Sequence, residues 1–141
     1  MVNDFCVTLS QKDFETMEDF KFQFEKLDAW QEARKLVASV YRLVGKFPQQ
    51  ERYGLSDQLH RAVVSVPSNI AEGSGRMAIK ESIHFLEIAF GSLMEVYCQL
   101  QLAVDLGYIN DDDLRAVKPQ IFTTSKLVSG LRKSKEAKLP H

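Results

Sequence analysis

The residues whose types and spacing could support catalysis are few. Glu81 and His84 have the Glu-x-x-His spacing that di-iron proteins use on two helices of a bundle, together with a glutamate from each of two further helices. The remaining histidines, His60 and His141, have no glutamate three residues before them, so half of that ligand set is missing. Ser74 lies between two glycines, but no histidine base for it is evident. The sequence therefore predicts no catalytic residue, no metal site and no cofactor.

A row of polar residues surrounds the stretch SVPSNIAEGSGR at residues 65–76. Its members recur at the three- and four-residue intervals of one helix face: Gln58, Arg61, Ser65, Asn69, Glu72 and Arg76. The simplest interpretation is a solvated face. Pro67 within the same helix suggests instead that the bend matters for packing or for a surface.

A second group lies in GSLMEV at residues 91–96. Gly91 and Ser92 have little side-chain bulk, so another backbone is expected to approach closely there. Glu95 is expected to make a buried contact to Arg61 or Gln58, and a functional use of its carboxylate is the alternative.

The apolar period predicts four helices that would position these groups. The first begins at Asp28 and is ended by Gly45 and Pro48. The second covers about residues 52–72, because its apolar phase continues through Pro67, which should kink it. Gly73 is expected to end this helix in a left-handed conformation.

The third helix is expected over residues 79–106, and the fourth begins at Asn110 or Asp111, which can cap it. Pro119 predicts either a kink or a delayed start in the fourth helix. The third helix is too apolar all round for a lone bundle to cover. The fold class is therefore all-α: an antiparallel up-down four-helix bundle with a proline-kinked second helix, assembling into a homo-oligomer.

Two terminal segments lie outside this pattern. Residues 1–24 are expected to form an N-terminal arm, loosely ordered or extended, since FKFQF at residues 20–24 alternates as a short strand would. Met17 would also be a reasonable translation start, and docking of the arm on a partner subunit is a further alternative. The bundle is placed at residues 25–133, and residues 134–141 are expected to form a basic tail that frays.

Composition excludes several classes of protein. A chain of 141 residues with 45% hydrophobic side chains is expected to be one domain with a packed core. Its two cysteines are far apart, which argues against a disulfide scaffold or zinc site and fits a cytoplasmic protein. No signal peptide or membrane span is predicted. The formal net charge is −1, which argues against strongly electrostatic binding of nucleic acid.

Three stretches occur in an order typical of one bacterial family: FEKLDAWQEARKL, FPQQERYGLSDQLHRAVVSVPSNIAEGSGR and IAFGSLMEV. Over about residues 22–133 the chain resembles the 23S rRNA-intervening-sequence proteins. That family is similar to the accessory variability determinant of diversity-generating retroelements. The resemblance implies an antiparallel four-helix bundle that forms a homopentamer. Ala78 departs from the family pattern, because it removes a capping hydroxyl before Glu81.

The resemblance also marks residues for the helix joint and a subunit contact. They are Gln58, Arg61, Pro67, Asn69, Glu72, Gly73, Arg76, Gly91 and Glu95.

The first predicted function is a non-enzymatic homo-oligomer that binds RNA or DNA as an accessory factor. The retroelement relatives bind nucleic acid and a reverse transcriptase through a basic surface, so a reverse transcriptase or another protein is a candidate partner. The candidate nucleic-acid contacts are Arg34, Lys35, Arg42, Lys46, Arg132 and Lys133. The alternative function is a protein-interaction scaffold without nucleic-acid binding, which the near-neutral charge favours. A metalloenzyme is the third hypothesis.

Overall fold

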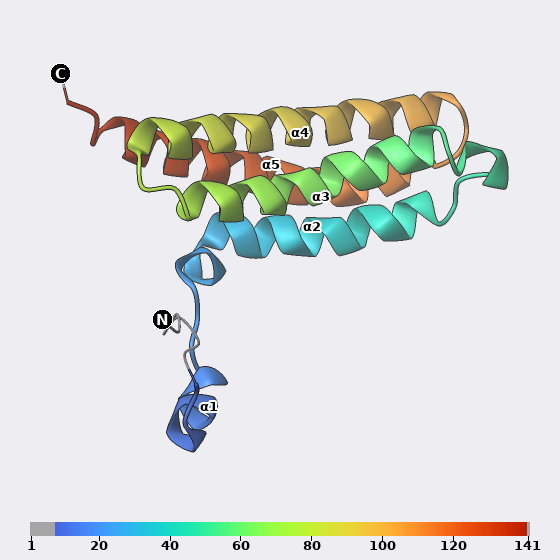
Figure 1. Ribbon diagram of the computed structural model, residues 1–141. Coiled ribbons are helices and arrows are strands. Elements are labelled where there is room, and N and C mark those ends of the chain that lie inside the picture. Colours follow the sequence, from blue (N-terminus) through green and yellow to red (C-terminus); the bar gives the residue numbers. More distant parts are fainter. Residues whose placement is uncertain (1–7, 141) are drawn as a thin grey trace.

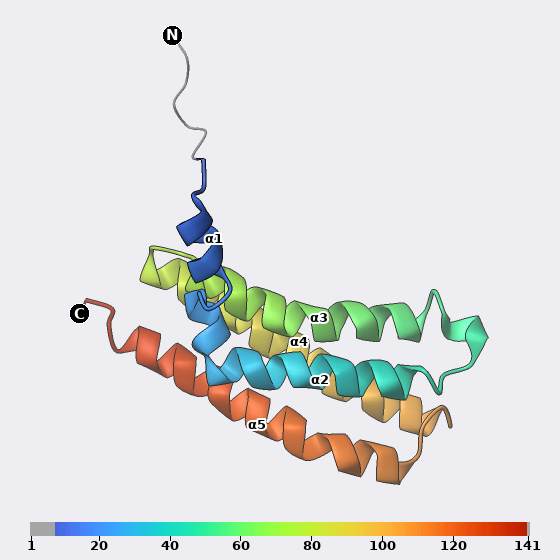
Figure 2. The same ribbon diagram turned by 90° about the horizontal axis from the view of Figure 1, so that it is seen from below.

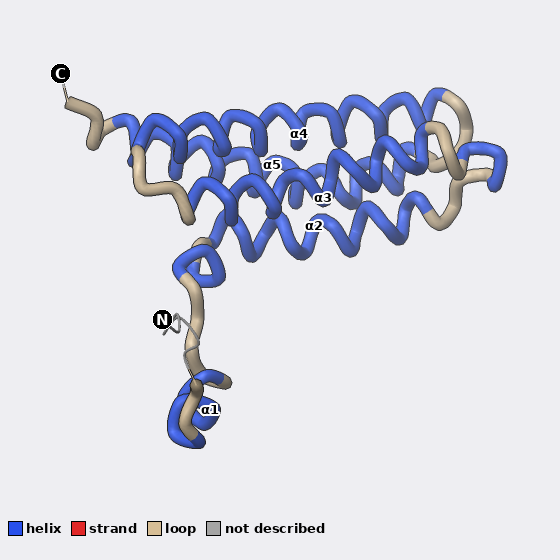
Figure 3. Tube along the Cα trace, in the orientation of Figure 1, coloured by secondary structure: helices blue, strands red, loops and turns tan. Residues whose placement is uncertain are grey.

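The computed structural model describes residues 8–140, and within that range the chain forms helices and no strand. The helices are α1 (Gln11–Met17), α2 (Asp28–Val44), α3 (Leu55–Ser74), α4 (Ile79–Asp105) and α5 (Asp111–Glu136). Two short 3₁₀ turns, η1 (Gln23–Lys26) and η2 (Gln49–Glu51), precede α2 and α3 (Figure 3). The predicted all-α class is confirmed. Residues 1–7 of the expected arm and His141 of the expected tail lie outside the described residues.

The four long helices lie side by side and bury one common core (Figures 1 and 2). Each helix contributes the apolar face that its period of three and four residues predicts. The largest fully buried side chains come from all four: Leu36, Val40, Leu59, Val63, Val66, Ile70, Leu93, Val96, Leu100, Thr124 and Val128.

Both internal prolines lie inside continuous helices. Pro67 is within α3, as the unbroken apolar phase predicts. Because proline has no backbone N–H, the carbonyl of Val63 loses its usual partner four residues later. Pro119 lies within α5, whose first residue is Asp111, so the alternative of a delayed start is wrong.

Gly73 does not have the left-handed conformation expected of it. The only positive φ among the described residues belongs to Gly107, at 77°, in the turn between α4 and α5. Gly73 is buried inside α3, and a Cβ added there would lie 3.2 Å from both the Phe85 Cβ and the Ser82 carbonyl oxygen. Glycine is therefore needed at this position for the close approach of α4, and its backbone freedom is not used.

The arm contains a helix that the sequence analysis missed. In α1, the Ser10 N–H donates to the Asp13 carboxylate at 2.8 Å and the Asp13 N–H donates to the Ser10 hydroxyl at 3.3 Å. This reciprocal cap follows from the Ser-x-x-Asp spacing. The strand or extended arm expected at residues 20–24 is also wrong in part, since Gln23 and Phe24 lie in η1. Figure 1 shows α1 standing clear of the four long helices.

The N-terminus of α4 has no side-chain cap. Ala78 is the N-cap residue and makes no capping hydrogen bond, whereas at α5 Asn110 accepts from the Asp113 N–H at 2.8 Å. We expect Ala78→Ser to raise the free energy of unfolding by about 1 kcal/mol, because a hydroxyl can accept from the Glu81 N–H. Urea denaturation at a fixed protein concentration measures the gain. Ala78→Val, which adds bulk without an acceptor, is the control and should not reproduce it.

Candidate functional site

The polar row of α3 meets α4 through a cluster of hydroxyl and amide groups. The Ser65 and Ser92 hydroxyl oxygens are 2.8 Å apart and share a hydrogen bond. The Asn69 side-chain amide donates to the Ser65 hydroxyl and to the Ser65 carbonyl oxygen, both at 2.8 Å. Asn69 therefore braces the backbone next to Pro67 and ties it to α4.

A second cluster lies further along the same two helices and is centred on Gln99, which the sequence analysis did not identify. The Gln99 amide nitrogen donates to the side-chain oxygens of Gln58 and Glu95, each at 3.2 Å. Gln99 is 6% exposed, and its Oε1 has no partner among the described residues. Its only sequence signal is its position one turn after Glu95, on the same face of α4.

We expected a buried contact between Glu95 and either Arg61 or Gln58, and this prediction is wrong. The Glu95 side chain is exposed and reaches Gln58 only through Gln99. Arg61 instead pairs with Asp57 one turn earlier, at 3.1 Å. The local pair forms because residues four apart on a helix are neighbours.

At the joint between α3 and α4, Glu72 and Arg76 of the polar row form an ion pair beside Gly73. The Arg76 guanidinium donates to the Glu72 carboxylate and lies 4.8 Å from the centre of the Phe85 ring. The buried Ser82 hydroxyl, which the sequence analysis missed, donates to the Gly73 carbonyl oxygen at 2.7 Å. The joint is thus a packed structural element with a satisfied polar edge.

Gly91 does not lie at a close helix crossing within the chain. A Cβ added to it would meet no atom within 4 Å, and the residue is exposed. The expected close approach of another backbone at Gly91 is therefore not found within residues 8–140.

The six candidate nucleic-acid contacts are all exposed and lie on α2, just after it, or on α5. Three of them form ion pairs: Lys35 with Glu32 at 3.3 Å, Lys46 with Asp113 at 2.7 Å, and Arg132 with Glu87 and Glu136 at 3.2 and 2.9 Å. Within residues 8–140, the other three make no ion pair: Arg34, Arg42 and Lys133. Arg34 lies over the Trp30 ring, 5.3 Å from its centre.

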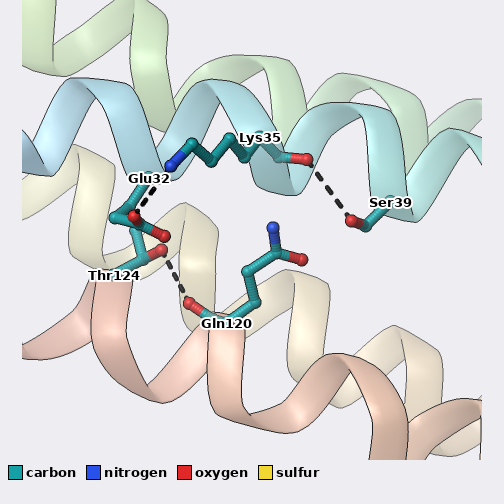
Figure 4. Close-up of polar contacts among 5 residues, drawn as sticks. All are labelled: Glu32, Lys35, Ser39, Gln120 and Thr124. Carbon is teal, nitrogen blue, oxygen red and sulfur yellow. Dashed lines mark hydrogen bonds and ion pairs between the residues drawn. The ribbon is translucent and has the colours of Figure 1, made fainter.

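Helices α2 and α5, which carry these six residues or directly precede them, lie beside each other. Figure 4 shows Lys35 and Ser39 on α2 facing Gln120 and Thr124 on α5. The Thr124 hydroxyl is fully buried and donates to the Gln120 carbonyl oxygen at 2.8 Å, so it needs no partner on α2. Further along, a surface groove of about 350 Å³ opens between the two helices and is lined by Arg42, Lys46, Asp113 and Gln120, among others.

Basic residues of the two helices are not interrupted by acids along the chain. Residues 33–46 contain four Lys or Arg and residues 114–135 contain six, with no Asp or Glu in either stretch. The acids that pair with them come from outside these stretches, as Asp113 and Glu87 do. Acids that flank the two stretches, such as Glu32 and Asp113, therefore neutralise the basic side chains of this surface only in part.

The ion pair at the groove makes stability depend on pH. A hydrogen bond from Lys46, followed by one from the Asn110 N–H, holds the pKa of Asp113 below its ordinary value of 3.8. Since the pKa is lower in the folded state, the stabilisation is present above pH 3.8 and is lost as the pH falls through the folded value.

We expect the melting temperature of Asp113→Asn to fall less steeply at acid pH than that of the unaltered protein. Asparagine keeps an acceptor for the Asn110 N–H but has no charge to lose. Thermal melts at several pH values between neutral and strongly acid conditions measure the slope. Asp111→Asn, a change of an exposed aspartate in the same turn, is the matched control. Equal slopes for the two variants would contradict the assignment to Asp113.

Within the described part of the chain, no group of three His, Cys, Asp or Glu side chains is placed to hold a metal ion. Glu81 and His84, the one Glu-x-x-His pair, are both exposed on the first turns of α4. No helix between residues 8 and 140 combines the length and apolarity that a membrane span requires.

Comparisons with known proteins identify the family. The model of the 23S rRNA-intervening sequence protein family matches residues 25–130. No curated protein matches the chain. Among solved structures, the chain is similar to a protein of unknown function from the S23 ribosomal protein family of Bacteroides thetaiotaomicron VPI-5482, with 20% identity and a TM-score of 0.68. That similarity covers 74% of this chain and 98% of the other, and it shows the shared fold. Because the family match spans most of the sequence, the chain belongs to the 23S rRNA-intervening sequence protein family.

Proposed function

We propose that this protein is a non-enzymatic homo-oligomeric accessory factor that binds RNA or DNA through the surface formed by α2 and α5. The observation that carries the proposal is the pair of neighbouring acid-free stretches, residues 33–46 and 114–135, with ten basic side chains between them. On this surface, Arg42 and Lys133 are exposed and make no ion pair within residues 8–140, so they are available to phosphates. Arg34 makes no ion pair in that range either, but it lines a groove between α2 and α3.

Binding of this kind depends on charge more than on base sequence. Lysine and arginine that neutralise phosphates release condensed counterions, so affinity falls steeply with salt. A net charge of −1 makes one chain a weak binder, but several copies in one assembly would present the same surface several times. The family name refers to a sequence in ribosomal RNA, which makes structured RNA the first ligand to test.

We further propose that α2–α5 form an antiparallel up-down bundle, because the colours of Figure 1 reverse direction from each long helix to the next. Assembly of that bundle into a homo-oligomer is supported by exposed apolar residues along α4 and just after it. These are Ile88, Met94, Leu102 and Leu106, which are 37%, 41%, 47% and 58% exposed. A homopentamer follows from the resemblance to the accessory variability determinant.

Two measurements test this function together. Light scattering at micromolar concentration should give a mass several times that of one chain, and a monomeric mass would contradict the assembly. Fluorescence anisotropy with a structured RNA and a duplex DNA should give binding whose logarithmic affinity falls linearly with the logarithm of salt. No binding at low salt, or binding that is insensitive to salt, would contradict the nucleic-acid role.

The alternative function is a protein-interaction scaffold, with a reverse transcriptase or another protein as the partner. It is favoured by the ion pairs that already neutralise Lys35, Lys46 and Arg132. Exposed aromatic groups such as Tyr53, which is 86% exposed, could contact a protein equally well. Capture of a stable protein partner that survives nuclease treatment, together with no RNA or DNA binding, would favour the scaffold.

A further inference from the structure

Residues 8–22, the described part of the arm that precedes η1, expose apolar side chains that no other residue between 8 and 140 covers. This segment is called the arm from here on. Leu9, Phe14, Met17, Phe20 and Phe22 are between 46% and 63% exposed. All residues from 8 to 23 are exposed, and no residue of α1 is buried. Five large apolar groups within so short a segment are more than a solvated surface needs.

The sequence of the arm nevertheless favours a helix. Ser10 and Asp13 cap the start of α1 reciprocally, and Phe14 and Met17 lie three residues apart on one of its faces. A helix of seven residues is too short to be stable alone in water, because nucleation costs more than its few hydrogen bonds return. A surface that covers its apolar face would supply the missing stabilisation.

One surface of the bundle fits the chemistry of the arm. A groove of about 400 Å³ runs between α2 and α3, and it is lined by Trp30, Arg34, Val37, Val64, Pro67, Ser68 and Ala71. Five of these seven residues are apolar, and Val64 is 40% exposed. We call this surface the α2/α3 groove.

The charges of the arm and of the groove are opposite. Residues 8–22 contain two lysines and four acidic residues, which gives a net charge of −2. Arg34 is the one charged residue of the groove, and residues 33–46 of α2 contain no acid. An acidic, apolar helix is therefore complementary to an apolar groove with a basic rim.

The arm points away from its own bundle, which favours docking on the α2/α3 groove of a second copy. Phe24 packs against Trp30 with ring centres 4.9 Å apart, and the Gln31 amide donates to the Glu25 carbonyl oxygen at 2.8 Å. These contacts fix η1 against the start of α2. Beyond η1 the chain turns away from the bundle, and α1 stands clear of the four long helices (Figure 1).

We propose that the arm of one copy docks in the α2/α3 groove of a second copy, with Phe14, Met17 and Phe20 covered by Val64, Pro67 and Trp30 of that copy. This arm exchange rests on the homo-oligomer of the proposed function and names the segment that joins its copies. It also explains why a segment outside the family match at residues 25–130 carries a capped amphipathic helix.

Site-specific cross-linking in the full chain tests whether the arm docks on its own copy or on a second copy. A photo-reactive phenylalanine analogue replaces Phe14, and ordinary chains are mixed with chains labelled with heavy nitrogen before irradiation. We expect cross-links from position 14 to peptides within residues 28–44 or 55–74, with half of them joining a light to a heavy chain. Cross-links only within one chain, or only to α4 and α5, would overturn the proposal.

Substitution of the arm tests its contribution to assembly. Phe14→Ser and Phe20→Ser are expected to weaken self-association by about tenfold each, since each removes a buried aromatic ring from the interface. Both side chains are exposed within the single chain, so helix content should not change. Phe122→Ser is the matched control, because Phe122 is 60% exposed on α5 and lies outside the groove.

The outcomes separate the two proposals. If the full chain is oligomeric but the arm variants and the cross-links show no effect of the arm, the arm exchange is wrong and the homo-oligomer stands. If the full chain is monomeric by sedimentation at all concentrations, the homo-oligomer of the proposed function is wrong, and the arm exchange with it.

Discussion

Replacing Gly73 with valine is expected to lower the free energy of unfolding by about 3 kcal/mol. A Cβ at this position would lie 3.2 Å from the Phe85 Cβ and 3.2 Å from the Ser82 carbonyl oxygen, and valine adds two methyl groups to that Cβ. The Ser82 oxygen belongs to the backbone of α4, so it cannot move aside without shifting the start of that helix. The hydrogen bond from the Ser82 hydroxyl to the Gly73 carbonyl would be broken by the same shift.

Urea denaturation, followed by circular dichroism at one fixed protomer concentration, measures this effect. Gly91→Ala is the matched control, because a Cβ there meets nothing within 4 Å. Within one chain, that change should stabilise α4 by about 1 kcal/mol through helix propensity alone. Similar effects of the two substitutions would show that the close approach at Gly73 does not limit stability.

Replacing Arg42 and Lys133 together with glutamine is expected to weaken RNA and DNA binding strongly. For each side chain that no longer neutralises a phosphate, affinity should fall by about tenfold at roughly 0.1 M salt, and the salt slope for duplex DNA should become shallower by about 0.9. These two residues are chosen because they make no ion pair within residues 8–140, so their replacement leaves no carboxylate unpartnered. Anisotropy titrations at several salt concentrations measure both quantities.

A second double variant controls for the change in net charge. Lys21→Gln and Lys80→Gln remove the same number of charges from the arm and the start of α4, outside the sequences of α2 and α5. This variant should keep most of the affinity and nearly the whole salt slope. If both variants weaken binding equally, the interaction is a general effect of charge and the α2/α5 surface is not its site.

Helix boundaries could be predicted where local signals agree with burial. Asp28 and Val44 bound α2 as the apolar period and Gly45 indicate, and α4 begins at the predicted Ile79. The continuation of α3 through Pro67 was predictable because Ile70 keeps the apolar phase. The arm helix was missed because a segment of seven residues shows no sustained period, although its Ser10-x-x-Asp13 cap was readable.

The contacts of the site were harder to predict, since their partners are distant in the sequence. Gln99 reaches Gln58 across 41 positions, and nothing in either residue's neighbourhood indicates that pairing. The role assigned to Gly73 was wrong for the same reason, because the atoms that exclude a side chain belong to α4. Likewise, Lys46 was selected as a phosphate contact, but its ammonium group forms an ion pair with the Asp113 carboxylate.

The short connection between α3 and α4 has a consequence for the order in which the chain folds. The Ser82 hydroxyl bonds to the Gly73 carbonyl across nine positions, so closing this hairpin sacrifices little chain entropy. The Lys46–Asp113 pair closes a loop of 67 positions between α2 and α5. Contacts of low sequence separation form early in folding. We therefore expect the α3–α4 hairpin to form first and the basic surface between α2 and α5 to be completed last.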